Sequence, residues 1–192
     1  MTTSAIIQSI GIGAGAIFVI ILLWSALVPQ LRIWPPQDYS RVSSGLTWLG
    51  TLGIFGPALW LGVSDWNALD LVAWLRFGPG LVAVILGNLI VWPAAFRFGY
   101  DQTSGAEGEL MTDGLYRYSR NPQYVADILM LAGWALLSAS ASALPVVALG
   151  IAALITAPFA EEPWLKAVYG NSYEAYMRRT PRFIGLPTEA RS

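Results

Sequence analysis

The chain contains no cysteine and no histidine. Their absence excludes disulfides, thiolate nucleophiles, Cys/His zinc sites, histidine-ligated haem and a Ser-His-Asp triad, and we expect no metal site. An enzyme made from this chain must therefore work with carboxylates, tyrosines, arginines, amides and the backbone. Such groups suit chemistry in which a bound cofactor carries the reactive group and the protein orients it.

Charge is also scarce. Charged residues make up 12% of the 192 residues and hydrophobic residues 55%, whereas about 25% of the residues of an average soluble domain are charged. A net charge of -1 argues against nucleic acid as a partner, because nucleic-acid-binding domains are basic. The composition therefore predicts a single membrane domain over residues 1–192.

Five apolar segments are long enough to cross about 30 Å of hydrocarbon at about 1.5 Å per helical residue. We expect an all-α integral membrane protein with about five transmembrane helices. No basic residue precedes the first segment, so we expect it to be a span and not a removed signal peptide. The expected spans are residues 5–28, 45–63, 77–98, 122–140 and 144–160.

The segment after the fifth span is amphipathic. In residues 163–183, Leu165, Val168, Tyr169, Tyr173 and Tyr176 fall near one helical face, with charged residues opposite. This pattern predicts a C-terminal helical segment that lies at the cytoplasmic membrane surface, with a break at Gly170.

The basic residues predict an orientation. With five spans, one side of the membrane receives ten basic residues and the other receives Arg76 alone, which we interpret as an interfacial anchor at the edge of the third span. The rule that basic loops stay inside then predicts a multi-pass protein of the cell (inner) membrane, with the N-terminus outside and the C-terminus in the cytoplasm. The ten residues are Arg32, Arg41, Arg97, Arg117, Arg120, Lys166, Arg178, Arg179, Arg182 and Arg191.

The densest polar and aromatic cluster is YRYSRNPQY at residues 116–124, directly before the fourth span. About three residues join the fourth span to the fifth, so these spans must form a tight antiparallel hairpin. The hairpin brings SRNPQY and AEEPWL, about forty residues apart, to the same membrane surface. The sequence therefore predicts a site at this end of the hairpin.

Each polar residue of this site also has a structural interpretation. Glu161 and Glu162 could open a new helix at Pro163, or face a ligand between the hairpin and the preceding loop. Arg120 could contact headgroups, and the tyrosines could form an aromatic belt. Pro122 suits the first turn of a helix, whose neighbouring N–H groups could bind an anionic group. Asp127, one turn inside the fourth span, is either functional or a packing residue.

The glycines of the first two spans favour close helix packing. GIGAG at residues 11–15 resembles a nucleotide-binding pattern, but no strand precedes it. Gly11 and Gly15 are spaced for one helix face, and we interpret them as packing residues. The same interpretation applies to Gly50, Gly53 and Gly56.

GLYRYSRNPQY, the apolar hairpin and EEPWLKAVYGNSYEAYMRRTPRF together resemble the isoprenylcysteine carboxyl methyltransferase and phospholipid methyltransferase superfamily. The likeness covers about residues 110–184, and Asn121 replaces the usual histidine, as in bacterial-type members and in the related sterol reductases. Asparagine keeps the hydrogen bonding of that position but loses its protonation. The matching residues are Gly114, Tyr116, Arg120, Pro122, Tyr124, Glu161, Glu162, Leu165, Tyr169, Gly170, Tyr173, Tyr176, Pro181, Arg182 and Phe183.

The resemblance implies a membrane methyltransferase that uses S-adenosylmethionine and has its cofactor pocket between the last two spans and the C-terminal segment. Asp127 and Arg182 are the catalytic candidates. The cofactor-binding candidates are Gly114, Tyr116, Tyr118, Arg120, Asn121, Pro122, Tyr124, Glu161, Glu162, Leu165 and Tyr173.

We expect methyl transfer to a lipophilic acceptor at the cytoplasmic membrane face. Trp134 and Trp164 are candidates to line an entry gap from the bilayer, although each is more simply interpreted as an ordinary interface or packing aromatic. Two alternatives stay open: an NADPH-dependent membrane reductase of the sterol-reductase type, and a non-enzymatic membrane subunit. A reductase would require additional basic groups around the cofactor phosphates.

Overall fold

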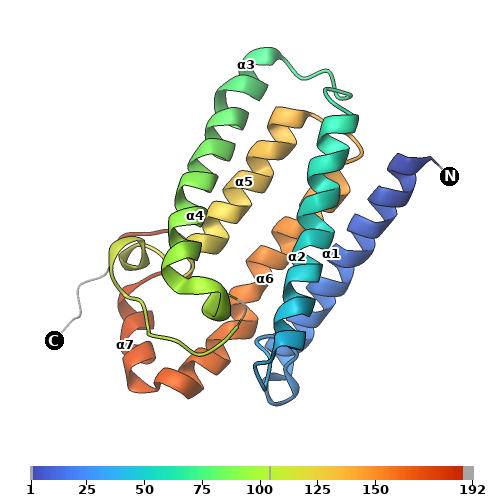
Figure 1. Ribbon diagram of the computed structural model, residues 1–192. Coiled ribbons are helices and arrows are strands. Elements are labelled where there is room, and N and C mark those ends of the chain that lie inside the picture. Colours follow the sequence, from blue (N-terminus) through green and yellow to red (C-terminus); the bar gives the residue numbers. More distant parts are fainter. Residues whose placement is uncertain (1, 104, 188–192) are drawn as a thin grey trace.

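The computed structural model describes residues 2–103 and 105–187, with side chains described outside residues 94–103. Long antiparallel helices form an elongated bundle, and the described residues contain no strand (Figure 1). The long helices are α1 (Thr3–Leu27), α2 (Arg41–Ser64), α4 (Leu81–Thr103), α5 (Pro122–Ser138) and α6 (Leu144–Tyr169). Shorter elements are η1 (Pro29–Leu31), α3 (Ala73–Leu75), η2 (Arg76–Gly80), η3 (Gly114–Arg117) and α7 (Asn171–Arg179).

Four helices of the described chain are long and apolar enough to cross a membrane: Thr3–Leu27, Arg41–Ser64, Ala73–Pro93 and Leu144–Tyr169. The expected all-helical membrane fold is therefore confirmed. Helix α5 has 17 residues, or about 26 Å, and the count of five spans stays a prediction. The orientation also stays a prediction; Arg191, one of its ten basic residues, lies outside the described residues, as does the side chain of Arg97.

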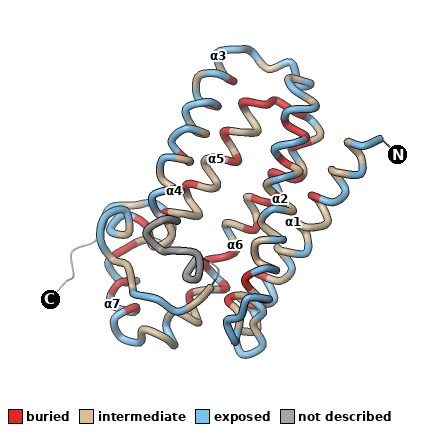
Figure 2. Tube along the Cα trace, viewed as in Figure 1, coloured by how far each residue is buried: buried red, intermediate tan, exposed pale blue. Residues whose placement is uncertain are grey.

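Burial concentrates along α5 and α6, while the outer faces of α1, α2 and α4 are exposed (Figure 2). In α6, 39% of the most apolar stretch is buried, against 17–22% in the other three spanning candidates. Large side chains such as Ile20 and Leu49 are 65% and 67% exposed, as expected of surfaces that face lipid and not water.

Most of the glycines interpreted as packing residues do allow helices to approach closely. A Cβ atom at Gly11 would lie 2.8 Å from Val146 Cγ2, and one at Gly15 would lie 2.7 Å from Leu149 Cβ. Added atoms at Gly50 and Gly53 would meet Phe18 and Ala14. The interpretation of Gly56 is wrong, since a Cβ atom there meets nothing within 4 Å.

Helix α6 continues past the expected end of the fifth span at residue 160 and includes Pro158 and Pro163. The alternative that Glu161 and Glu162 open a new helix is therefore wrong. Pro158 and Pro163 remove backbone hydrogen bonds from this part of α6. Hydrogen bonds of the Glu161 and Glu162 side chains to other segments hold the helix there. The helix ends at Gly170, whose φ of +53° is readily adopted by glycine, and the predicted break there is confirmed.

The opposite end of the bundle is held by Arg76, which is 5% exposed. Its Nε donates to the carbonyl of Leu137 at 3.0 Å, at the C-terminal turn of α5, and its guanidinium lies over the Trp66 ring. The interpretation of Arg76 as an interfacial anchor is wrong, because the C-terminal carbonyls of α5 attract the cation inward.

Candidate active site

The hairpin of α5 and α6 brings the two polar segments together, as predicted. Arg120 Nη2 lies 2.6 Å from Glu162 Oε1, and the Tyr124 hydroxyl donates to Glu161 Oε1. Pro122 at the first position of α5 fixes where that helix begins. The tight turn 139–143 at the other end sets the register of the two helices.

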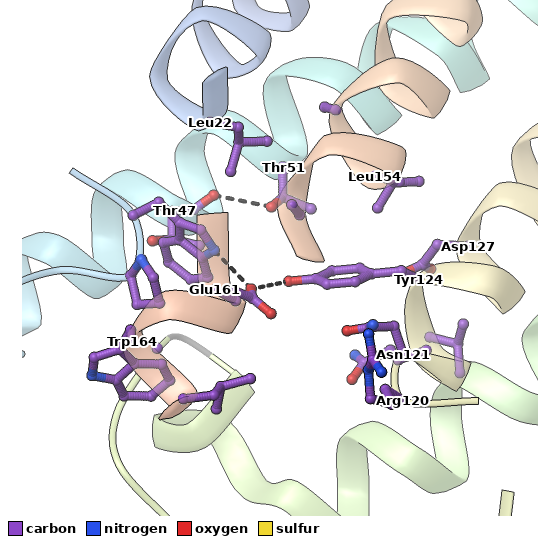
Figure 3. A pocket seen from close by; sticks show the side chains of 18 of the residues that line it. Leu22, Thr47, Thr51, Arg120, Asn121, Tyr124, Asp127, Leu154, Glu161 and Trp164 are labelled. Carbon is purple, nitrogen blue, oxygen red and sulfur yellow. Dashed lines mark hydrogen bonds between the residues drawn. The ribbon is translucent and has the colours of Figure 1, made fainter. Parts of the chain in front are cut away.

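A cavity of about 530 Å³ opens beside these segments. This volume is typical of a site for a cofactor or drug-sized ligand. Figure 3 shows Tyr124 and Glu161 pointing toward one another, with Asp127 beside Tyr124, and Arg120 and Asn121 on the same side of the site. The wall is mostly apolar and includes Phe18 and Leu22 of α1, Ile54 of α2 and Leu154 of α6.

Glu161 is one of three carboxylates that line the cavity, with Glu109 and Asp127, among the residues that the structure describes. Its Oε1 accepts hydrogen bonds from the hydroxyl of Tyr124 and, at 2.8 Å, from the indole Nε1 of Trp34. Its Oε2 makes no hydrogen bond within the described part of the chain. One oxygen is thus fixed by the protein, and the other is available to a ligand.

Glu162 has a different role. Its carboxylate is 8% exposed and accepts from Arg120 Nη2 at 2.6 Å, from Arg182 Nε at 2.8 Å and from Arg182 Nη2 at 2.7 Å. Bidentate arginine–carboxylate pairs of this kind are strong and geometrically specific. The pair raises the pKa of Arg182, so its guanidinium stays charged.

Helical geometry explains why neighbouring glutamates differ. Successive residues of an α-helix are about 100° apart, so Glu161 and Glu162 cannot point the same way. With Glu161 directed into the cavity, Glu162 faces the C-terminal segment and its arginines. The two adjacent glutamates therefore connect the cavity to the C-terminal segment that encloses it.

Arg120 ties the start of α5 to the C-terminal segment. Its Nη1 donates to the carbonyls of Met177 and Thr180 at 3.1 and 3.0 Å, and so caps the C-terminus of α7. Its backbone N–H donates to Pro181, and the amide of Asn121 donates to the carbonyl of Arg182 at 3.0 Å. Asn121 thus serves here as a hydrogen-bond donor to the backbone.

Two tyrosines of α7 complete this end of the cavity. Tyr173 and Tyr176 are both 2% exposed by residue area and line the cavity. The hydroxyl of Tyr176 donates to the carbonyl of Tyr116 at 2.7 Å. Burial raises the pKa of both tyrosines, so they are neutral hydroxyls at physiological pH.

Asp127 lines the cavity one turn along α5 from Tyr124. It makes no hydrogen bond to any residue that the structure describes. A carboxylate without a partner at this depth is costly for a membrane protein. The geometry therefore favours a ligand-facing role over packing.

The predicted site residues divide into two groups. Those that line the cavity are Tyr116, Arg120, Asn121, Tyr124, Asp127, Glu161, Leu165 and Tyr173. Those outside the lining are Gly114, Tyr118, Pro122, Glu162 and Arg182. Gly114 has a φ of +56° at the start of η3, the carbonyl of Tyr118 accepts from Gly185, and Pro122 is buried. The catalytic role of Arg182 and the cofactor-binding roles remain predictions.

Of the two tryptophans predicted to line the entry gap, only one lines the cavity. Trp164 lines the cavity. Trp134 instead donates to the carbonyl of Ala58 at 2.9 Å and fills the space above Gly62, where it packs α5 against α2.

Sequence reasoning missed the wall supplied by α1, α2 and the connector between them, above all Trp34. The available signal was a tryptophan followed by two prolines in a short interhelical segment. Neither the tryptophan nor the prolines identify a partner such as Glu161, which lies 127 residues away in the sequence.

The fold and the cavity define a helical membrane protein with an internal site of cofactor size. Residues 74–172, half of the chain, match the phospholipid methyltransferase family, and the chain belongs to that family. A stretch of 101 residues is 29% identical to the steroid 5-alpha-reductase DET2 of Solanum lycopersicum. That match covers 52% of this chain and 39% of the reductase, so the chain spans about two fifths of that relative's length. No solved structure matches.

Proposed function

We propose that this protein transfers a methyl group from S-adenosylmethionine to a lipophilic acceptor at the cytoplasmic membrane face. Membership of the phospholipid methyltransferase family supports a membrane methyltransferase. The observation that carries the cofactor assignment is the carboxylate of Glu161, which faces a mostly apolar cavity. S-adenosylmethionine bears a sulfonium and an ammonium group, which such a carboxylate stabilises.

The charge of the cavity distinguishes this function from the reductase alternative, which the likeness to DET2 favours. NADPH carries several phosphate charges and requires cationic partners. Among the described residues of the lining, Arg120 is the one basic side chain. Its terminal nitrogens already bind Glu162, Met177 and Thr180.

The chemistry fits a chain that has neither cysteine nor histidine. The cofactor supplies an activated methyl group, and the protein aligns the donor and acceptor and excludes water. Such alignment contributes roughly 7–11 kcal/mol in well-oriented reactions. Tyr124, Glu161, Tyr116 and Tyr173 would hold the cofactor, and Asp127 would orient a polar acceptor atom or attract a cationic amine.

The apolar wall supports a lipophilic acceptor. The hydroxyl of Thr51 donates to the carbonyl of Thr47, and that of Thr47 donates to Ser43, so both are used within α2. This side of the cavity therefore offers an acceptor mainly apolar contacts. We propose that the acceptor enters from the bilayer past Trp164 and that the cofactor exchanges through the polar end near Arg120.

Calorimetric titration of purified protein in detergent with S-adenosylhomocysteine and, separately, with NADPH tests the cofactor. We expect binding of the former and none of the latter; the reverse result would establish the reductase alternative. Glu161→Gln should weaken binding at least about tenfold, the scale of a charge-assisted hydrogen bond. Glu174→Gln, the same change on the exposed face of α7 and outside the cavity, is the matched control and should bind like the parent.

The acceptor is tested with S-adenosylmethionine labelled in its methyl group. The enzyme is offered a total lipid extract and, in a second reaction, a water-soluble metabolite extract. We expect label in the lipid products, and its loss in Asp127→Asn with cofactor binding retained. Label only in water-soluble products would contradict a lipophilic acceptor while leaving methyl transfer intact.

A further inference from the structure

Residues 28–40 connect α1 to α2 and lie outside residues 74–172, the stretch that matches the family. The connector is tied to the last turns of α1. The hydroxyl of Ser25, fully buried, accepts the backbone N–H groups of Ile33 and Trp34, each at 3.0 Å. The indole of Trp24 donates to the carbonyl of Leu31 at 3.0 Å. The two bonds to Ser25 fix the backbone where the Trp34 side chain begins.

The Trp34 side chain is held from two sides. It packs against the buried cluster of Leu22, Ala153, Ala157 and Ala160. From the other direction Gly105 approaches so closely that a Cβ atom there would lie 3.2 Å from the indole ring. Held in this way, the indole N–H points at Glu161 Oε1, at 2.8 Å.

We propose that Trp34, which lies outside the stretch that matches the family, is a positioning residue and orients Glu161 so that Oε2 faces the ligand. The proposal rests on the proposed function, because it concerns the same cavity. A glutamate side chain loses rotamer freedom when it is fixed, and that loss opposes ligand binding. Trp34 from the connector and Tyr124 from α5 fix the same oxygen before any ligand arrives. A ligand therefore binds a preorganised carboxylate and does not have to order it.

The geometry also defines the chemistry that Glu161 recognises. An ionised Glu161 only accepts hydrogen bonds, so the ligand group at the remaining oxygen, Oε2, must be a hydrogen-bond donor or a cation. An ammonium or an amino group fulfils this requirement, and a phosphate does not.

The test is a double-mutant cycle on ligand affinity, measured by calorimetric titration with S-adenosylhomocysteine. Trp34→Phe keeps an aromatic ring and removes the N–H, and we expect affinity to fall about five- to tenfold. In the Glu161→Ala background the same change should alter affinity less than about twofold, because its acceptor is already gone. Trp24→Phe is the matched control: it removes an indole hydrogen bond in the same connector, outside the cavity, and should change affinity less than about twofold.

Each outcome is decisive. Trp34→Phe with the affinity of the parent, equal losses in both backgrounds, or an equal loss in Trp24→Phe would overturn the proposal. If Trp34→Phe does not fold, Trp34 is replaced by its benzothiophene analogue, which keeps the ring shape and lacks the N–H. If the parent binds NADPH and not S-adenosylhomocysteine, the proposed function fails and the same cycle, measured with NADPH, decides the role of Trp34. A parent that binds neither ligand overturns both.

Discussion

Replacing Glu161 and Glu162 by glutamine, one at a time, should distinguish the glutamate that faces the ligand from the glutamate that stabilises the fold. Glu162→Gln removes the charge that pairs with Arg120, whose side chain is 8% exposed, and with Arg182, whose side chain is 32% exposed. Removing one partner of a buried pair costs about 3–5 kcal/mol. The more exposed Arg182 adds only about 0.5–1 kcal/mol. We therefore expect a loss of at least about 3 kcal/mol in the free energy of unfolding.

Thermal unfolding in detergent measures this loss. For a chain of this size about 1 kcal/mol corresponds to about 2–4 °C, so the midpoint of Glu162→Gln should fall by at least about 6 °C. Glu161→Gln, one residue away, should fall by no more than about 2–4 °C, because Trp34 and Tyr124 can still donate to the amide oxygen. Glu174→Gln, on the exposed face of α7, is the matched control and should stay within about 0.5 kcal/mol of the parent.

The reasoning is refuted if Glu162→Gln unfolds within about 1 kcal/mol of the parent. It is also refuted if the stability losses at the two positions are reversed. Either result would mean that the ion pair of Glu162 contributes little net stability, and that the division between a ligand carboxylate and a scaffold carboxylate is wrong.

Three further perturbations test the bundle. Gly133→Ala places a Cβ atom 2.8 Å from the Val84 backbone nitrogen and should lower the free energy of unfolding by about 1–3 kcal/mol. Gly56→Ala has open space around it and should be neutral or stabilising. Equal effects of the two substitutions would contradict the α4–α5 packing. Hydrogen bonds from the α5–α6 turn hold the pKa of Asp65 below its usual 3.8, and the largest contribution comes from the backbone N–H of Ser142. These bonds should stabilise the fold above pH about 4, and the stabilisation should be lost as pH falls through the folded-state pKa. Asp65→Asn should remove this pH dependence. Because the chain has no cysteine, an impermeant maleimide applied outside should label Ala68→Cys and not Ser172→Cys, and the opposite pattern would reverse the proposed orientation.

The sequence predicted the helical membrane fold and the meeting of the two polar segments, because both follow from local information. Apolar runs define the helices, and a three-residue turn forces the hairpin. The roles of Glu161 and Glu162 could not be separated in the same way. Their difference depends on how α6 is rotated about its axis, and contacts with Trp34 and Arg182 fix that rotation.

The same limitation explains the misinterpretation of Arg76. A basic residue at the edge of an apolar run resembles an interfacial anchor, and the sequence does not show that the carbonyl of Leu137, sixty-one residues away, lies within its reach. Asp127 is the opposite case, since a carboxylate inside an apolar run already requires an explanation in the sequence.

The wall that α1, α2 and their connector give to the cavity has a consequence for comparing or recombining family members. Residues 74–172 are a unit of sequence similarity, but they are not a unit of folding. Ile54, Ala58 and Leu61 of α2 share one buried cluster with Leu131 of α5 and Val146 of α6. A chimera that exchanges only the matched stretch would join one protein's polar motif to another protein's apolar wall. Two chains with the same motif can therefore present differently shaped cavities, and the first 73 residues encode the part of that difference that α1, α2 and their connector contribute.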